Sequence, residues 1–331
     1  MLNERFAPPE ENFAGGLRDV EIPELGEGRS GKVSKIWEIP RSSLMVIVRT
    51  DRVSVFDNVV GAVPGKGAVL NKLSAFWGGK TGDILPDHVI AVPHPNVLIA
   101  HKTTPLPVEV VVRGFLTRSS TDTSPWGRYS KGEREMYGLT FPEGLRANER
   151  YPEAIVTPTT KAVGGEHDKP LTDEEARGLV DDKFGTGIWD KARTAALAVF
   201  ARGQQLSLER GFILVDTKYE FGEIDGDIVF IDEMNTPDSS RFWRANTYEE
   251  RFAASDDPDS FDKEALRRWC AQRGYRGEGK IPVIDRHEID SMAKAYQELY
   301  ESLTGETLPD VLSDATTIRA AVLDSLRGMG L

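Results

Sequence analysis

Ionised side chains alternate with apolar ones along one predicted strand, VDTKYEF. Asp216, Lys218 and Glu220 would share one face of it, because successive side chains of a strand point to opposite sides. The return run ends in Asp232 and Glu233. Carboxylates suit Mg²⁺ and a lysine suits phosphate or carboxylate oxygens, so the pattern favours a nucleotide–metal site. The alternative is the solvent face of an ordinary antiparallel sheet.

A glycine-rich segment, GEGRSGKV at residues 26–33, matches three phosphate-loop patterns at once. Rossmann and P-loop sites need a helix after the glycines, whereas the following KVSKIWEI is strand-like. The kinase type has strands on both sides of the loop and fits best. We therefore predict a strand–loop–strand with no helix beginning at Lys32. The alternative is a flexible glycine-rich arm that leads into a strand.

The elements that must position these residues follow from hydrophobic periodicity and turn signals. Residues 1–30 read as an irregular arm, 117–160 as a long functional loop region, and Asp225-Gly226 as a tight hairpin turn. Other strands are predicted at 32–39, 43–50, 88–93, 96–103 and 108–116. Helices are predicted at 68–79 (stopped by two glycines), from a capping box at Thr172, and at 187–209, 262–274 and 285–303. This order suggests a two-lobed α+β protein with a boundary near residue 105.

Composition limits the class of protein. The chain has 331 residues, of which 39% are hydrophobic and 28% charged, as in ordinary soluble globular proteins. The formal net charge of −12 disfavours nucleic-acid binding. Cys270 is the single cysteine, so no intrachain disulfide can form. The polar N-terminus does not resemble a signal peptide and no apolar run is long enough for a membrane span, so we expect a cytoplasmic protein. No oligomeric state is predicted.

Several long blocks resemble one family. DTKYEFG, IDE and TPDSSRFW resemble the SAICAR synthetases, and so do, in the same order over most of the chain, SGKVSKIWEI, TDRVSVFDNVVGAVPGKGAVLNKLSAFW, VEVVVRGFLTRSS, TPTTKAVGGEHD and SFDKEALRRW. The resemblance implies an ATP-dependent ligase of purine biosynthesis that joins L-aspartate to the carboxylate of carboxyaminoimidazole ribonucleotide (CAIR), giving SAICAR, ADP and phosphate. It also implies that ATP lies in a cleft between an N-terminal nucleotide-clamping lobe, 1–105, with a kinase-like loop, and a larger C-terminal substrate and metal lobe, 106–331.

The resemblance assigns a role to each matching residue. Lys218 and Asp216 would line the reacting end, and Glu220 and Asp232 would bind Mg²⁺. The nucleotide would be contacted by Gly31, Lys32, Val33, Glu109 (on the adenine side), Lys161 and Glu220. CAIR and aspartate would be contacted by Arg113, Ser119, Ser240 and Arg241, with Lys66, His167 and Asp168 as further candidates. Because a planar guanidinium gives bidentate contact with a carboxylate or phosphate, we predict that Arg113 and Arg241 converge on one pocket.

Two positions depart from the family pattern. Ser34 stands where a second basic residue is common, so either Lys35 replaces it or one phosphate contact is missing. Arg118 stands where the segment T-G-S usually has glycine.

The assignment of Asp232 to the metal also sets the hairpin register. A two-residue turn at Asp225-Gly226 would place Glu233 opposite Lys218, whereas a three-residue turn would place Asp232 there. A one-residue slip exchanges the two faces of a strand. We therefore predict an odd-length loop, or a bulge with the same effect.

Two other classes of protein stay open. A kinase-type phosphotransferase is disfavoured, because the sequence has neither H-R-D-x-x-x-x-N nor D-F-G. A non-catalytic nucleotide-binding protein of the same fold would not need Lys218, Glu220 and Asp232 together.

Overall fold

The computed structural model describes residues 7–119, 123–161, 168–309 and 314–331. The chain is an α+β protein with antiparallel sheets, in agreement with the predicted class. It divides into two compact units. The first comprises Met1–Phe76, His88–Lys102 and Asp262–Leu331, and the second comprises Trp77–Asp87 and Thr103–Phe261.

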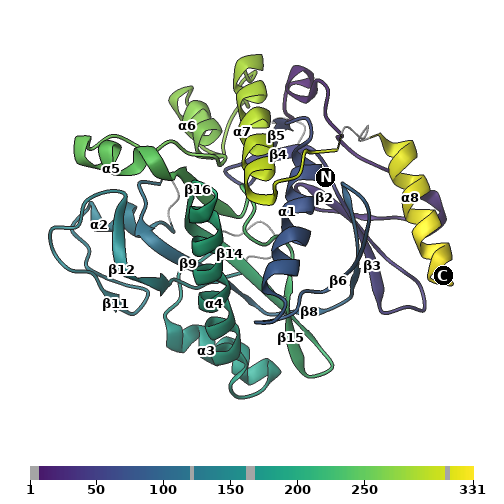
Figure 1. Ribbon diagram of the computed structural model, residues 1–331, viewed down its shortest axis with the longest axis horizontal. Helices are drawn as coiled ribbons and strands as arrows, with labels where there is room; N and C mark the ends of the chain where they lie inside the picture. Colours follow the sequence, from purple (N-terminus) through teal and green to yellow (C-terminus); the bar gives the residue numbers. More distant parts are fainter. Residues whose placement is uncertain (1–6, 120–122, 162–167, 310–313) are drawn as a thin grey trace. The chain divides into compact units, whose positions relative to one another are not determined.

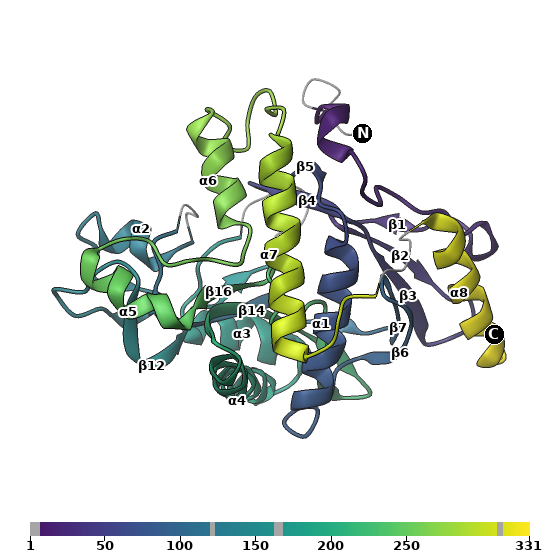
Figure 2. The same ribbon diagram turned by 45° about the horizontal axis from the view of Figure 1, so that its top comes forward.

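The first unit is built on a five-stranded sheet in the order β1-β2-β3-β7-β6. Its strands are β1 (Arg29–Ser30), β2 (Ser34–Glu38), β3 (Leu44–Arg49), β7 (Val97–His101) and β6 (Val89–His94). Helix α8 (Ala315–Gly328) lies along this sheet (Figure 2) and buries Ile318, Val322 and Leu326 against it. Apolar residues at these helical spacings give α8 one face for the core.

The rest of the first unit consists of a hairpin and helices. The hairpin joins β4 (Arg52–Val55) to β5 (Asn58–Ala62), and the short helices η2 (Glu10–Phe13) and η3 (Pro23–Leu25) precede the sheet. Helices α6 (Glu264–Gln272) and α7 (Arg286–Thr304) follow the predicted ranges closely.

Helix α1 (Lys66–Thr81) runs from the first unit into the second. The prediction that it stops at two glycines is wrong. Gly78 is helical, and a Cβ there would lie 1.8 Å from Oδ2 of Asp87. A side chain at this position would require the Asp87 carboxylate to move.

The second unit is built on a seven-stranded antiparallel sheet around β9 (Val108–Leu116) and β14 (Phe212–Ile224). The sheet runs β12-β9-β14-β15, with β13 also paired to β9, and β8 and β16 to β14. The bounds are β8 (Thr104–Pro105), β12 (Glu149–Val156), β13 (Thr159–Thr160), β15 (Asp227–Ile231) and β16 (Ser240–Arg244).

Helices α3 (Asp173–Phe184) and α4 (Ile188–Glu209) belong to the same unit, and α4 packs against β14 and β9 (Figure 1). The predicted capping box is confirmed: Thr172 accepts from the backbone N–H of Glu175, and the Glu175 side chain accepts from the N–H of Thr172. Each bond satisfies a backbone donor that the helix leaves unpaired.

Several predictions of local structure need correction. Residues 117–160 are not one long loop, because they contain α2 (Pro125–Tyr129), β10 (Glu135–Met136), β11 (Leu139–Thr140) and β12. Large apolar and aromatic side chains, among them Met136 and Phe141, pack together there without a regular spacing in the sequence. Helices α5 (Ala245–Ala254) and α8 were not predicted.

The compact units also divide the chain differently from the predicted ranges 1–105 and 106–331. The boundary near 105 lies close to the division between Lys102 and Thr103, but Asp262–Leu331 belongs to the first unit. The apolar face of α8 accounts for part of this difference, because it completes the core of the first sheet.

Two hairpins decide two further predictions. The glycine-rich segment is a strand–loop–strand, in which β1 pairs with β2 through Arg29↔Ile36, and no helix begins at Lys32.

The β14–β15 turn has two residues, since Ile224 pairs with Asp227. The prediction of an odd-length loop, or of a bulge with the same effect, is therefore wrong, because the register from Glu220↔Ile231 to Ile224↔Asp227 has no shift. Both turn residues have positive φ (Asp225 54°, Gly226 86°), as a two-residue type I′ turn requires.

Within the described ranges, no helix has the length and apolarity needed to cross a membrane.

Candidate active site

The sheet of the second unit brings distant polar residues together. Strand β14 pairs with β9 on one side, with Asp216 opposite Arg113, and with β16 on the other, with Asp216 opposite Arg241. Strand β13 places Thr159 opposite Glu109. The alternating charges of β14 therefore face side chains from three neighbouring strands.

Arg113 and Arg241 converge, as predicted, and the group between them is the carboxylate of Asp216. Nη1 of Arg113 donates to Oδ2 of Asp216 at 3.3 Å, and Nη1 of Arg241 donates to the same oxygen at 2.6 Å. Nη2 of Arg241 donates to Oγ of Ser119 at 2.7 Å. Both ends of the Arg241 guanidinium are thus held.

This arginine cluster lies inside the sheet. Asp216 is 3% exposed and Arg113 is 5% exposed. Arg241 is partly buried, with its side chain 16% exposed. Two guanidinium groups this close would repel one another without a negative charge between them, so the carboxylate of Asp216 stabilises the pair. A substrate anion could take the place of that carboxylate. Thr157 accepts from Nε of Arg113 at 2.8 Å and fixes the plane of its guanidinium.

A second cluster alternates acids and bases. Nζ of Lys218 donates to Oε1 of Glu109 at 2.7 Å and to Oε1 of Glu220 at 2.6 Å. Nζ of Lys161 donates to the other oxygen of Glu220. Thr159 donates to Glu109 at 3.4 Å. Both carboxylates are less than a tenth exposed, so each needs such partners.

Electrostatics in this second cluster are strong. Loss of solvation lowers the pKa of Lys218, but the nearby carboxylates, Glu220 first, outweigh that loss and raise the pKa well above its usual value. Lys218 is therefore an ammonium at neutral pH. Burial raises the pKa of Glu109, although the charge of Lys218 opposes the rise.

Asp232 lies at the edge of this cluster in spite of the unexpected register. It directly follows β15, has a φ of 62° and is exposed, and its charge contributes to the raised pKa of Lys218. Glu233 is 7% exposed and accepts a hydrogen bond from Thr236. Asp232 is thus not buried behind the sheet, and the predicted metal role is not transferred to Glu233.

The remaining candidates lie in different surroundings. Ser240 is buried and donates to Oγ1 of Thr217 at 2.7 Å, within the β14–β16 pair. Lys66 is fully buried at the start of α1, where its charge acts on Asp51. Asp168 acts electrostatically on Glu109. His167 lies outside the described residues.

Gly31, Lys32 and Val33 form the turn of the β1–β2 hairpin in the first unit, and Lys32 pairs with Asp57 at 2.6 Å between exposed side chains. Lys35 is 4% exposed and donates to Glu21, so its charge is already neutralised inside the unit. Both readings of the Ser34 position stay predictions.

The described residues contain no group of three or more acidic, histidine or cysteine side chains that could hold a metal ion by themselves. Mg²⁺ is commonly bound by one or two carboxylates together with substrate phosphates. Glu220 and Asp232 fit that smaller donor set, provided that phosphate oxygens supply further ligands.

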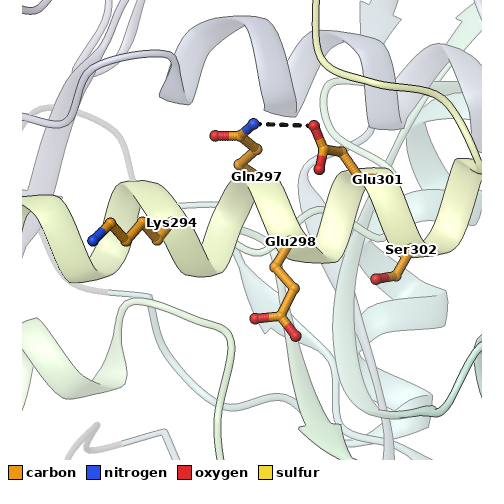
Figure 3. Close-up of a pocket in the computed structure, with 5 residues that line it drawn as sticks. All are labelled: Lys294, Gln297, Glu298, Glu301 and Ser302. Atoms are coloured by element: carbon orange, nitrogen blue, oxygen red, sulfur yellow. Dashed lines mark hydrogen bonds between the residues drawn. The ribbon is translucent and has the colours of Figure 1, made fainter.

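One surface pocket of about 440 Å³ lies on α7 (Figure 3). It is lined by Lys294, Gln297, Glu298, Glu301 and Ser302. Within it Gln297 donates to Glu301 at 3.0 Å. None of the predicted site residues lines it, and its walls come from a single helix, so it does not compete with the β9–β14 site as a catalytic centre.

Sequence reasoning missed the hydroxyl groups that support the charges. Thr157 contacts Arg113, Thr159 contacts Glu109, and Thr117 donates to Asp216 at 3.5 Å. Thr157, Thr159 and Lys161 belong to the TPTTK block and are spaced by two residues. In an extended segment this spacing places the three side chains on the same side, and it could have indicated that the threonines lie beside the site.

Comparisons with known proteins identify the family of this chain. The SAICAR synthetase family profile matches residues 28–284. A Mesorhizobium japonicum protein, provisionally named phosphoribosylaminoimidazole-succinocarboxamide synthase 2, is 42% identical over 315 residues, which cover 94% of this chain and 97% of that protein. The phosphoribosylaminoimidazole-succinocarboxamide synthase of Legionella pneumophila is 43% identical, with 88% of this chain and 91% of that protein covered.

Solved structures lead to the same family. The SAICAR synthase from Saccharomyces cerevisiae, in complex with SAICAR, has a TM-score of 0.73 and 29% sequence identity, over 88% of this chain and 99% of that one. The family profile, the curated relatives and this structure each match most of the chain, and the chain belongs to the SAICAR synthetase family.

Proposed function

We propose that the two charged clusters of the β9–β14 sheet divide the family's reaction between them. The chain is an ATP-dependent ligase of purine biosynthesis, as its family membership implies. The observation that carries the residue assignments is the convergence of Arg113 and Arg241 on one carboxylate, next to the acid–base cluster on the same strand.

The chemistry explains why both clusters are needed. The carboxylate of CAIR is a poor acyl donor, because its leaving group would be oxide. Transfer of the γ-phosphoryl group of ATP to a carboxylate oxygen gives an acyl phosphate, and attack by the amine of L-aspartate then forms the amide and releases phosphate. The enzyme contributes mainly positioning and charge neutralisation.

The arginine cluster is the proposed site for CAIR. Arg113 and Arg241 would bind its carboxylate or phosphate in bidentate fashion, and Ser119 would keep Arg241 in place. Asp216 holds the two guanidinium groups together before the substrate enters. Substrate binding then replaces or shares the contact with Asp216, at the reacting end of the site.

The acid–base cluster is the proposed site for the phosphates. Lys161 and Lys218 would neutralise charge on the transferred group, and Lys218 acts as a cation rather than a base because its pKa is raised. Glu220 and Asp232 would hold Mg²⁺, which when bound neutralises phosphate oxygens. Glu109 would contact the adenine side of the nucleotide, with its carboxylate oriented by Lys218 and Thr159.

The glycine-rich hairpin of the first unit is proposed as the nucleotide clamp, with Gly31, Lys32 and Val33 against the phosphates. In this proposal ATP binds in a cleft between two lobes, as in kinases. Ser240, Lys66, His167 and Asp168 remain proposed substrate-side residues, and a cytoplasmic location remains a prediction.

Purified protein mixed with ATP, Mg²⁺, CAIR and L-aspartate tests the function. We expect ADP release that requires both CAIR and aspartate, and its loss in Glu220→Gln. ADP release without dependence on aspartate would instead indicate a phosphotransferase or an ATPase. Nucleotide binding without turnover would indicate a binding protein of the same fold.

A further inference from the structure

Arg118 is one of the two residues at which the chain departs from the family pattern, and neither charged cluster contains it. It directly follows Thr117 and directly precedes Ser119. Both of these neighbours contact the arginine cluster, Thr117 through Asp216 and Ser119 through Arg241. Arg118 itself contacts a different part of the second unit.

Three polar groups meet around Arg118. Its backbone N–H donates to Oδ1 of Asn148 at 2.9 Å, and its Nη1 lies 3.2 Å from Oδ1 of Asp257. The amide of Asn148 donates to the same carboxylate oxygen at 3.5 Å, which closes a triangle. Main chain and side chain of Arg118 are therefore fixed by two groups that are also joined to each other.

Each anchor of this triangle is itself held. Asn148 is 4% exposed, has a φ of 64°, and its backbone oxygen accepts from the hydroxyl of Tyr248 at 2.9 Å. Arg251 donates to the backbone oxygen of Asp257 at 3.1 Å. The triangle thus rests on groups fixed by other parts of the unit, so it can hold the backbone at Arg118 in one position.

We propose that Arg118, through its pair with Asp257, is a positioning residue for Ser119 and so for the substrate-facing guanidinium of Arg241. The inference rests on the proposed assignment of Ser119 and Arg241 to CAIR. Ser119 and Asp216 hold the two ends of the Arg241 guanidinium. A shift of the backbone at Ser119 frees one end, and the planar group then loses the orientation that bidentate contact requires.

The expected effect is on substrate affinity rather than on stability. The side chains of Arg118 and Asp257 are 47% and 33% exposed, and pairs this exposed contribute little to folding. We expect Arg118→Gln to raise the KM for CAIR about two- to five-fold, in line with the small energies of such pairs. The kcat, the KM for ATP and the melting temperature should stay near the wild-type values.

Asp257→Asn should have the same effect, and the double variant Arg118→Gln/Asp257→Asn should be no worse than either single variant, because both remove one contact. Arg118→Lys keeps the charge and should recover most of the loss. Arg202→Gln is the matched control: Arg202 is a similarly exposed arginine that pairs with Asp83, away from the arginine cluster, and should leave the KM for CAIR unchanged.

Ser119→Ala, measured in the same assay, distinguishes a failure of the positioning role of Arg118 from a failure of the assignment of Ser119 to the CAIR site. If Ser119→Ala raises the KM for CAIR and Arg118→Gln does not, the positioning role is wrong and the CAIR site stands. If neither variant changes that KM, the assignment of Ser119 fails and the inference fails with it. Equal changes in the KM values for CAIR and ATP, or additive effects in the double variant, would also overturn it.

Discussion

Asp216→Asn is the substitution that most directly tests the arginine cluster. It removes the negative charge between Arg113 and Arg241 with almost no change in volume. Asp216 is 3% exposed and accepts from both guanidinium groups at 3.3 and 2.6 Å, so the variant leaves two cations close together in the sheet. The folded state should therefore lose free energy, and the site should acquire a stronger need for an external anion.

Removing one partner from a buried ion pair costs about 3–5 kcal/mol, because the remaining charge is left uncompensated. At roughly 2–4 °C per kcal/mol for domains of this size, the melting temperature should fall by roughly 6–20 °C in buffer without multivalent anions. A phosphate ion that binds between the arginines at 100 times its dissociation constant should restore about 2.7 kcal/mol.

The assay is urea or thermal unfolding of wild type and variant with increasing inorganic phosphate at constant ionic strength. Asp83→Asn is the matched control, since Asp83 also pairs with an arginine but is 68% exposed, and its loss should leave the melting temperature close to that of the wild type. The reasoning would be refuted if Asp216→Asn were as stable as Asp83→Asn, or if phosphate stabilised wild type and variant equally.

Other predictions concern affinity and pH. Arg241→Lys keeps the charge but loses the planar fork, so calorimetry should show weaker CAIR binding with ATP binding unchanged; equal losses would contradict the assignment. Lys161→Met frees one oxygen of Glu220, so Mn²⁺ used as a probe for Mg²⁺ should bind more tightly to the nucleotide-free variant and ATP more weakly; unchanged Mn²⁺ binding would count against a metal role for Glu220. Burial raises the pKa of Glu109 above its ordinary value of 4.5. The folded state therefore binds the Glu109 proton more tightly than the unfolded state does. This contribution to the free energy of unfolding is complete below pH 4.5 and is lost as pH rises through the raised pKa. The unfolding free energy of wild type minus that of Glu109→Gln should therefore fall from pH 4.5 towards neutrality, and a flat or rising difference would contradict the shift.

The charged face of β14 could be predicted from sequence because alternation in a strand is a local property. Asp216, Lys218 and Glu220 lie where that alternation places them, and the neighbouring strands supply the expected arginines. The convergence of Arg113 and Arg241 came from the family resemblance, since pairing between β9, β14 and β16 cannot be read from spacing alone.

The prediction of the β14–β15 register was wrong for a different reason. Asp225-Gly226 is the composition that a two-residue type I′ turn favours, and the structure has that turn, whereas the expected metal role of Asp232 favoured the other register. The chain leaves the ladder after Ile231, and the positive φ of Asp232 lets its carboxylate act on Lys218 without a slip of the strands. The backbone conformation of Asp232, one residue past the strand, cannot be predicted from the alternation of apolar and polar residues within the strand.

Other misses depend on packing between distant segments. Gly78 and Gly79 indicate a helix stop in the sequence, but both lie inside α1, where Gly78 leaves room for the carboxylate of Asp87. Helix α8 follows β7 by more than 200 residues, yet its apolar face completes the core of the sheet that contains β7. Such contacts join residues that are far apart in the sequence, so local helix or strand propensity does not predict them.

In the proposed order of steps, a carboxylate oxygen of CAIR attacks the γ-phosphoryl group before aspartate forms the amide. Oxygen-18 in both positions of the CAIR carboxylate tests this claim most directly, with the released phosphate analysed by mass spectrometry in the presence of ATP, Mg²⁺ and L-aspartate. The proposed order of steps predicts one oxygen-18 atom in each phosphate and one retained in the amide product. Phosphate that carries no label while SAICAR is formed would contradict it.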